Sequence, residues 1–212
     1  MEQGGAIMTL SALFEKCLAA PYTHTPEGID YAFHREGRHL YLYLEASDGV
    51  ADWLRNLDFP AAAYRRDGRA VFYAHRGFLR AFRVLEPLFA EVIRDPTLAA
   101  VTTVGYSHGA AIAVLAHEYF WYHREDLRPC LLGYGFGSPR VLFGGGRRAL
   151  AERFSHFSVI RNLDDLVTHL PPAALGYYHV GRLIEIGERG RYSRIDAHRE
   201  ESIARELARA GL

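Results

Sequence analysis

One short segment near the middle of the chain constrains the fold more than any other. Residues 99–104 are apolar and rich in β-branched side chains, which indicates a buried strand. The motif GYSHG follows at residues 105–109, and residues 110–123 then have the composition of an apolar helix. A serine between two glycines on a sharp strand-to-helix turn is typical of an exposed, strained nucleophile. The alternative is a glycine-rich turn with an idle serine, but the flanking strand and helix favour a nucleophilic Ser107.

The rest of the chain alternates between strand and helix patterns. Helices are expected at residues 9–20, 77–93, 110–123, 147–154 and 202–210, and strands at 29–35, 39–44, 71–74, 99–104, 130–135, 157–160 and 183–186. Because the strands are apolar and helices separate several of them, we predict an α/β fold with a mostly parallel sheet covered on both faces. Such a sheet binds ligands at the carboxyl ends of its strands, where the serine lies. With no linker or internal repeat in 212 residues, a single domain spanning 1–212 is expected.

The charge balance narrows the possible partners. The chain has 25 Lys and Arg residues and 25 Asp and Glu residues, so its formal net charge is zero. It therefore lacks the excess of basic residues typical of proteins that bind nucleic acids or anionic membranes. No run reaches the roughly 18 apolar residues of a transmembrane helix. The sequence says nothing about oligomeric state.

The N-terminal region and the cysteines bear on cellular location. The apolar residues 10–20 are interrupted by Glu15 and Lys16, and no basic segment precedes them, so no signal peptide is indicated. A cytoplasmic location is therefore expected, although secretion by another route stays open. Cys17 and Cys130 have no metal-ligand spacing, and their pairing in a disulfide stays open.

A nucleophilic serine needs a histidine to accept its proton and a carboxylate to orient that histidine. In one common arrangement the chain order is serine, acid and then histidine. Asp164 and Asp165 follow the expected strand 157–160 and so lie at the correct edge of the sheet. Chain order leaves three histidines as candidates for the base: His169, His179 and His198.

Several motifs, in a fixed order, resemble those of the class 3 lipases, a family of α/β hydrolases. The motifs are YLYLEAS at 41–47, DWLRNL at 52–57, HRGF at 75–78, GYSHG at 105–109, YGFGSPRV at 134–141, DLVTHLPP at 165–172 and YHVG at 178–181. The resemblance covers roughly residues 29–200. It implies an α/β-hydrolase fold and a lipase or esterase activity.

The resemblance also selects among the candidate residues. It assigns Ser107 as the nucleophile, Asp165 as the orienting acid and His198, in a late D-x-H motif, as the base. His169 lies inside the motif that follows Asp165 and is the remaining alternative for the base. His179 belongs to a motif that is usually structural in the family.

The resemblance places the oxyanion hole at the backbone N–H groups of Ser47 and His108. The sequence departs from the family pattern here, because Glu45 and Ala46 replace an arginine and a glycine, and because His108 replaces a leucine. The replacement of the glycine by Ala46 directly precedes Ser47. We interpret the His108 imidazole as one whose hydrogen-bonding groups are satisfied by neighbouring side chains. Contact with a substrate head group is the alternative.

These residues predict ester hydrolysis through an acyl-enzyme on Ser107, with no metal or organic cofactor. Activity is expected to fall below about pH 6 to 7, because a histidine base must be neutral. Residues 48–51 are too few to form a helical lid, which favours an open site, small or soluble esters and little interfacial activation. Phospholipid, monoacylglycerol and feruloyl esters stay open as substrates. The rival functions are a silent binding module with the same fold and an acyltransferase using the same triad.

Overall fold

The fold is built on a twisted, mostly parallel β-sheet. The structure is a computed structural model that describes residues 8–46 and 59–212. In these ranges the main sheet has the order β1-β2-β3-β6-β7-β9-β11. Its strands are β1 (Thr23–His24), β2 (Ile29–Glu36), β3 (His39–Ala46), β6 (Ala100–Tyr106), β7 (Leu131–Phe136), β9 (Phe157–Asn162) and β11 (Arg182–Ile186). The strands from β3 to β11 pair in parallel, and β1 and β2 add an antiparallel edge.

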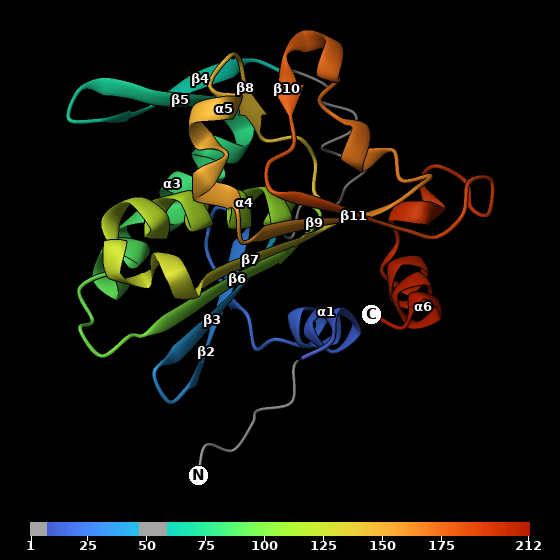
Figure 1. The fold of residues 1–212 in the computed structure, drawn as a ribbon, viewed down its shortest axis with the longest axis horizontal. Coiled ribbons are helices and arrows are strands. Elements are labelled where there is room, and N and C mark those ends of the chain that lie inside the picture. Colours follow the sequence, from blue (N-terminus) through green and yellow to red (C-terminus); the bar gives the residue numbers. More distant parts are fainter. Residues whose placement is uncertain (1–7, 47–58) are drawn as a thin grey trace.

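Helices cover both faces of this sheet, as Figure 1 shows. The α-helices are α1 (Leu10–Leu18), α3 (Arg76–Val92), α4 (His108–His123), the short α5 (Arg147–Leu150) and α6 (Glu200–Ala210). Helices α3 and α4 pack on one face through a core that includes Phe82 and Leu42. Helices α1 and α6 pack on the other face around Phe14 and Val104. The predicted α/β architecture is therefore confirmed.

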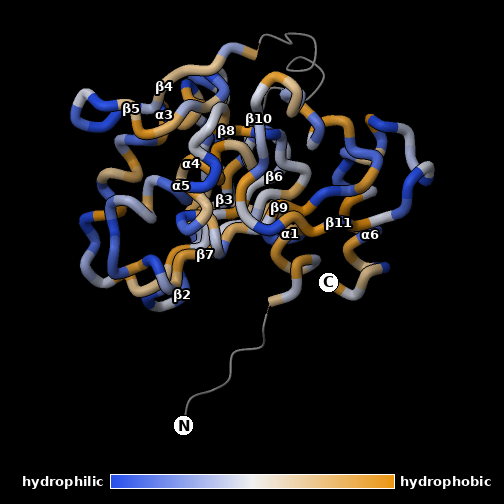
Figure 2. Tube along the Cα trace, turned by 45° about the horizontal axis from the view of Figure 1, so that its top comes forward, coloured by the Kyte–Doolittle hydropathy of each residue, from blue (hydrophilic) through white to orange (hydrophobic). Residues whose placement is uncertain are grey.

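The alternation of side chains along the strands explains this arrangement. On β3, Leu42 and Leu44 point into the core under α3 and α4, whereas Tyr43 points into the core under α1 and α6. The hydrophobic segments accordingly gather in the middle of the molecule, and the loops at its rim are hydrophilic (Figure 2). Both faces are buried, as expected for parallel strands.

A second, smaller sheet was not predicted. Within the described ranges it has the order β10-β8-β5-β4. Its strands are β4 (Ala61–Arg66), β5 (Arg69–His75), β8 (Leu142–Phe143) and β10 (Tyr177–Tyr178). The sequence AAAYRR of β4 has none of the β-branched residues that mark a strand, and β8 and β10 have two residues each. Only β5 carried a recognisable strand pattern.

Short 3-10 turns connect the main elements. They are Glu125–Cys130, Glu152–Phe154, Val167–His169, Ala173–Leu175 and Asp196–His198. The last of these leads directly into α6 and carries the histidine predicted as the base. Residues 147–154, expected to be one helix, form α5 followed by a 3-10 turn.

The structure bears on the expectations about membrane-spanning helices and about the two cysteines. Among the helices of residues 8–46 and 59–212, none combines the length and the apolar character that crossing a membrane requires. In the described chain Cys17 is buried, Cys130 is exposed, and both are free thiols. Burial raises the pKa of the Cys17 thiol to about 12, so this cysteine remains protonated and unreactive at neutral pH.

Candidate active site

Ser107 occupies the sharp turn between β6 and α4. Its backbone has φ 54° and ψ −120°, a left-handed value of φ that a non-glycine residue rarely adopts. Its N–H donates to the carbonyl oxygen of Phe136 on the neighbouring strand at 2.9 Å, which fixes the turn at the carboxyl edge of the sheet. The turn therefore holds the serine in the strained conformation that the sequence predicted, but the serine side chain is buried rather than exposed.

The two glycines of the GYSHG motif have a steric role. A Cβ atom on Gly105 would collide with the backbone of Gly109, and a Cβ atom on Gly109 would collide with the carbonyl group of Leu44 on β3. Only glycine therefore lets the first turn of α4 lie directly against the strands. This close approach aims the amino end of α4, which begins at His108, at the serine.

His198 connects Ser107 to Asp165 through two short hydrogen bonds. The Nε2 atom of His198 lies 2.8 Å from Ser107 Oγ, and its Nδ1 atom lies 2.8 Å from Asp165 Oδ2. If Nδ1 carries the proton and donates to the carboxylate, Nε2 is left as an acceptor for the serine hydroxyl. All three side chains are buried, and Asp165 is wholly inaccessible to solvent.

Asp165 is held by the loop that follows β9. Its second carboxylate oxygen, Oδ1, accepts the N–H of Val167 at 2.8 Å, and its own N–H donates to the carbonyl oxygen of Asn162 at 3.0 Å. The hydroxyl of Thr168 donates to the carbonyl oxygen of Asp165 at 2.9 Å. The carboxylate can therefore turn neither away from His198 nor toward water.

Two residues that the sequence did not single out position the turn carrying His198. The hydroxyl of Tyr106 donates to the carbonyl oxygen of His198 at 2.7 Å, and its ring stacks on the imidazole with centroids 5.3 Å apart. The buried amide Nδ2 of Asn162 donates to the carbonyl oxygen of Ala197 at 3.0 Å. Tyr106 ends β6 next to the nucleophile, and Asn162 ends β9. Their positions at the ends of strands are the only sequence feature that could have indicated a role in the site.

Gly137 forms one wall of the site. Its φ of +58° is left-handed, and a Cβ atom there would lie 2.9 Å from His198 Cε1 and 3.3 Å from Asp165 Oδ2. Its N–H donates to the carbonyl oxygen of Ile160 at 2.8 Å, which fixes the backbone in this position. The absence of a side chain at Gly137 thus leaves room for the imidazole. Gly137 lies within the YGFGSPRV motif, but no role was assigned to it from the sequence.

The other candidate acids and bases lie elsewhere. Asp164 Oδ2 accepts the N–H of Gly190 at 2.7 Å and so fixes a loop. The Nε2–H of His179 donates to the carbonyl oxygen of Thr168 at 2.8 Å, and burial lowers its pKa to about 4. His169 lines a separate polar pocket. The structure brings none of these three side chains into hydrogen bonding with Ser107.

The predicted oxyanion hole is described only in part. His108 is the first residue of α4, and its half-buried ring packs beside Phe78 with centroids 5.3 Å apart. Ser47 and the DWLRNL motif lie outside the described residues, as does the 48–51 segment. At the described end of β3, burial raises the pKa of Glu45, and the nearby carboxylates of Glu200 and Asp30 raise it further.

A small apolar pocket opens beside the base. Its volume is about 140 Å³. It is lined by Tyr106, Leu166, Val167, Arg194, Ile195, His198 and Arg199. Ile195 is 61% exposed, which is unusual for an isoleucine and extends the apolar surface to the rim of the pocket. Within the described ranges, no group of His, Cys, Asp and Glu side chains is arranged to hold a metal ion.

The parallel sheet and the strained serine turn, with a histidine and an aspartate in chain order, define an α/β-hydrolase fold. The solved structure of the triacylglyceride lipase of Rhizomucor miehei superposes with a TM-score of 0.68 at 24% identity, covering 78% of this chain and 64% of that one. The family model for "Lipase (class 3)" matches residues 41–175. The chain therefore belongs to the class 3 lipase family, and the predicted family and fold are confirmed.

Two curated relatives are similar in sequence. A lipase of Rhizomucor miehei is 29% identical over 148 residues, which cover 67% of this chain and 40% of the relative. A secreted mono- and diacylglycerol lipase of Fusarium solani is 29% identical over 162 residues, which cover 74% of this chain and 46% of the relative. The chain thus matches less than half the length of either curated relative.

The comparison corrects one expectation. The predicted cytoplasmic location is wrong, because the relatives include a secreted enzyme and point to an extracellular location. The prediction depended on Glu15 and Lys16 interrupting an apolar stretch. Those residues lie in α1, a helix that packs on the main sheet, so their pattern reports on the fold rather than on targeting.

Proposed function

We propose that this protein is a serine hydrolase that cleaves carboxylic esters through an acyl-enzyme. The observation that carries this proposal is the continuous hydrogen-bonded chain from Ser107 Oγ through the His198 imidazole to the Asp165 carboxylate. A buried serine with left-handed backbone angles serves no evident packing purpose. An acceptor nitrogen at 2.8 Å from its hydroxyl is the arrangement that activates such a group as a nucleophile.

The reaction follows from this geometry. Ser107 Oγ attacks the carbonyl carbon of the ester while His198 Nε2 takes the hydroxyl proton. Asp165 stabilises the imidazolium, and the negative carbonyl oxygen is bound by backbone N–H groups, which we assign to His108 and Ser47. The tetrahedral intermediate then expels the alcohol, which leaves with the proton from His198. Water repeats the sequence on the acyl-enzyme and releases the acid and the free serine.

The relatives and the pocket suggest the class of substrate. One relative is named a mono- and diacylglycerol lipase, and the pocket beside His198 is apolar, so lipid esters are the proposed substrates. We propose that residues 1–212 act as a single catalytic domain. Little interfacial activation stays a prediction, because the short 48–51 segment on which it depends lies outside the described residues.

The test measures hydrolysis of a monoacylglycerol and of a soluble short-chain ester by the wild type and by Ser107→Ala. Loss of the nucleophile should lower kcat by at least about 10⁴-fold. Ser155→Ala, which removes the hydroxyl of an exposed serine, is the matched control and should retain full activity. Comparable activity in Ser107→Ala would overturn the proposal.

Two further readouts separate the rival functions. Ester formation when an alcohol is added would identify an acyltransferase, since the same residues would pass the acyl group to the alcohol instead of to water. A folded wild type that cleaves no ester would favour the binding module. Folding is checked by circular dichroism in each case.

A further inference from the structure

A second pocket, larger and polar, adjoins the apolar pocket at His198. Its volume is about 280 Å³. It is lined by Arg161, Leu163, Asp164, His169, Arg189 and Arg194. Arg194 lines both pockets, so the polar one lies one side chain away from the pocket that contains the base.

Two guanidiniums of this polar pocket have no ionic partner among the described residues, although the pocket also holds the carboxylate of Asp164. Arg189 and Arg194 are exposed, and within residues 8–46 and 59–212 neither guanidinium makes an ion pair or a hydrogen bond. Arg161 pairs with Glu185 on β11, yet its Nε atom is buried without a partner. The one acid in the lining, Asp164, accepts the N–H of Gly190.

Elsewhere in the described chain, many arginines are paired with carboxylates. Examples are Arg35 with Asp95, Arg66 with Glu118, Arg124 with Asp126, Arg128 with Glu125, and Arg191 with Glu188. Within the described ranges other exposed arginines, such as Arg80 and Arg83, also make no ion pair. The polar pocket therefore differs in that Arg189 and Arg194 converge on one hollow beside Arg161. Their positive field also reaches His169: burial lowers its pKa, and Arg161, Arg140 and Arg194 lower it further.

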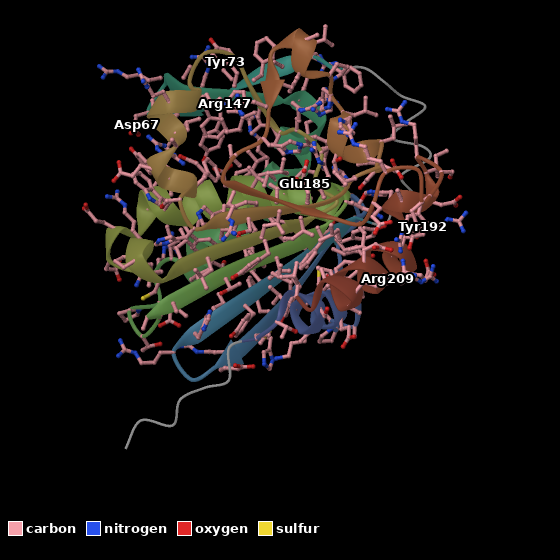
Figure 3. The ribbon with its side chains drawn as sticks, turned by 45° about the vertical axis from the view of Figure 1, so that its right-hand side comes forward. Asp67, Tyr73, Arg147, Glu185, Tyr192 and Arg209 are labelled. Atoms are coloured by element: carbon pink, nitrogen blue, oxygen red, sulfur yellow. The ribbon has the colours of Figure 1, made fainter. Side chains whose placement is uncertain are left out.

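The loop that carries Arg189 and Arg194 is anchored at several points. The carbonyl oxygen of Arg194 accepts the N–H of Leu166 at 3.0 Å, in addition to the contact between Gly190 and Asp164. Tyr192 lies beside α6 (Figure 3), where its hydroxyl donates to Glu206 Oε1 at 2.8 Å. The loop backbone is thus fixed at Gly190, Tyr192 and Arg194, while the exposed guanidiniums of Arg189 and Arg194 remain available to a ligand.

We propose that this polar pocket binds an anionic group of the ester substrate, a phosphate or a carboxylate, while the apolar pocket takes the hydrocarbon beside the scissile ester. The inference rests on the proposed function and makes it more specific. A guanidinium presents N–H donors in a planar fork that matches both anions. An uncharged ester such as a monoacylglycerol would leave these donors unused.

The kinetic test uses three esters with the same acyl chain: a monoacylglycerol, its phosphate, and the acyl ester of glyceric acid. Each is presented in the same neutral detergent. At least one anionic ester should have a kcat/KM about tenfold or more above that of the neutral ester, the range expected for a charge-assisted hydrogen bond. Comparison of kcat/KM for the phosphate and for the glycerate ester identifies which anion the pocket accepts. The preference should shrink as salt is added.

The double variant Arg189→Gln/Arg194→Gln should abolish this preference. The matched control is Arg80→Gln/Arg83→Gln, which removes the same charge from exposed positions on α3 and should keep it. Equal kcat/KM values for neutral and anionic esters in the wild type would overturn the inference. An equal loss in the control would also overturn it, since the effect would then be one of net charge.

A binding measurement separates this inference from the proposed function. Uncleavable alkyl ethers of glycerol and of glycerol phosphate are titrated into Ser107→Ala by calorimetry. Tighter binding of the phosphate that is lost in the arginine double variant supports the inference even if no ester is cleaved. Equal binding of the two ethers, together with no preference for the glycerate ester, overturns it even if esters are cleaved.

Discussion

At the scale of single residues, Gly137 leaves room for the His198 imidazole, and Asn162 holds the turn that carries it. Ser107, Asp165 and His198 lie in motifs with a recognisable chain order, and the structure brings them within hydrogen-bonding distance. Gly137 and Asn162 act through contacts with residues far along the chain, and no local pattern reveals such contacts. The role of the Ser47 backbone N–H in the oxyanion hole stays a prediction.

The Gly137→Ala variant tests whether this position makes room for the base. The new methyl group would lie 2.9 Å from His198 Cε1, so the imidazole must shift. A displacement approaching 1 Å typically lowers the rate about 100-fold, and we expect a fall in kcat of this order. Gly37→Ala is the control, since Gly37 has nearly the same φ, +60°, and no atom within 4 Å of the added Cβ. Equal kcat losses in both variants would show that only backbone strain is involved.

At the scale of secondary-structure elements, the main sheet was predictable and the small sheet was not. Strands β3, β6, β7 and β9 could be predicted from their apolar runs, which occur because both faces of these strands are buried. Strand β4 is instead held by its partner β5 and by one side chain. Arg66, at its end, reaches the buried carboxylate of Glu118 on α4, and its guanidinium lies 3.6 Å from the centroid of the Tyr122 ring.

The Glu118→Gln variant should therefore destabilise the protein as a whole. Glu118 also binds Arg153, so its removal leaves two guanidiniums without their carboxylate in a largely buried place. Losing one partner of a buried ion pair costs about 3 to 5 kcal/mol. Urea unfolding would measure this cost as a decrease in the free energy of unfolding. Glu125→Gln breaks an exposed pair with Arg128 and should cost less than about 1 kcal/mol. Similar costs for the two variants would contradict this account of β4.

At the scale of the whole molecule, the buried His117 and the half-buried His179 should make the fold sensitive to acid. Burial lowers the pKa values of His117 and His179 to about 4, from 6.5 in an exposed chain. The unfolded chain therefore binds protons first as the pH falls, and stability that is complete above about pH 6.5 is lost toward pH 4. His117 contributes on the order of 3 kcal/mol to this loss, and the half-buried His179 contributes less because solvent screens its charge.

Urea unfolding at a series of pH values between neutral and pH 4 measures this effect. The free energy of unfolding should fall steeply over the range, and His117→Gln should make the fall shallower because it removes one titrating group. The Nε2–H of His117 donates to the carbonyl oxygen of Arg153 at 3.0 Å, a bond that a glutamine amide can replace. An unfolding free energy that does not change across this range would contradict the prediction.

The central claim is that His198 and Asp165 activate Ser107, and labelling with a fluorophosphonate tests it most directly. The probe reacts with an activated serine without needing the correct ester. The account predicts one adduct, located on Ser107 by mass spectrometry, that is absent from Ser107→Ala and strongly reduced in a folded His198→Ala. A folded wild-type protein that stays unlabelled, or an adduct that persists in Ser107→Ala, would contradict the account.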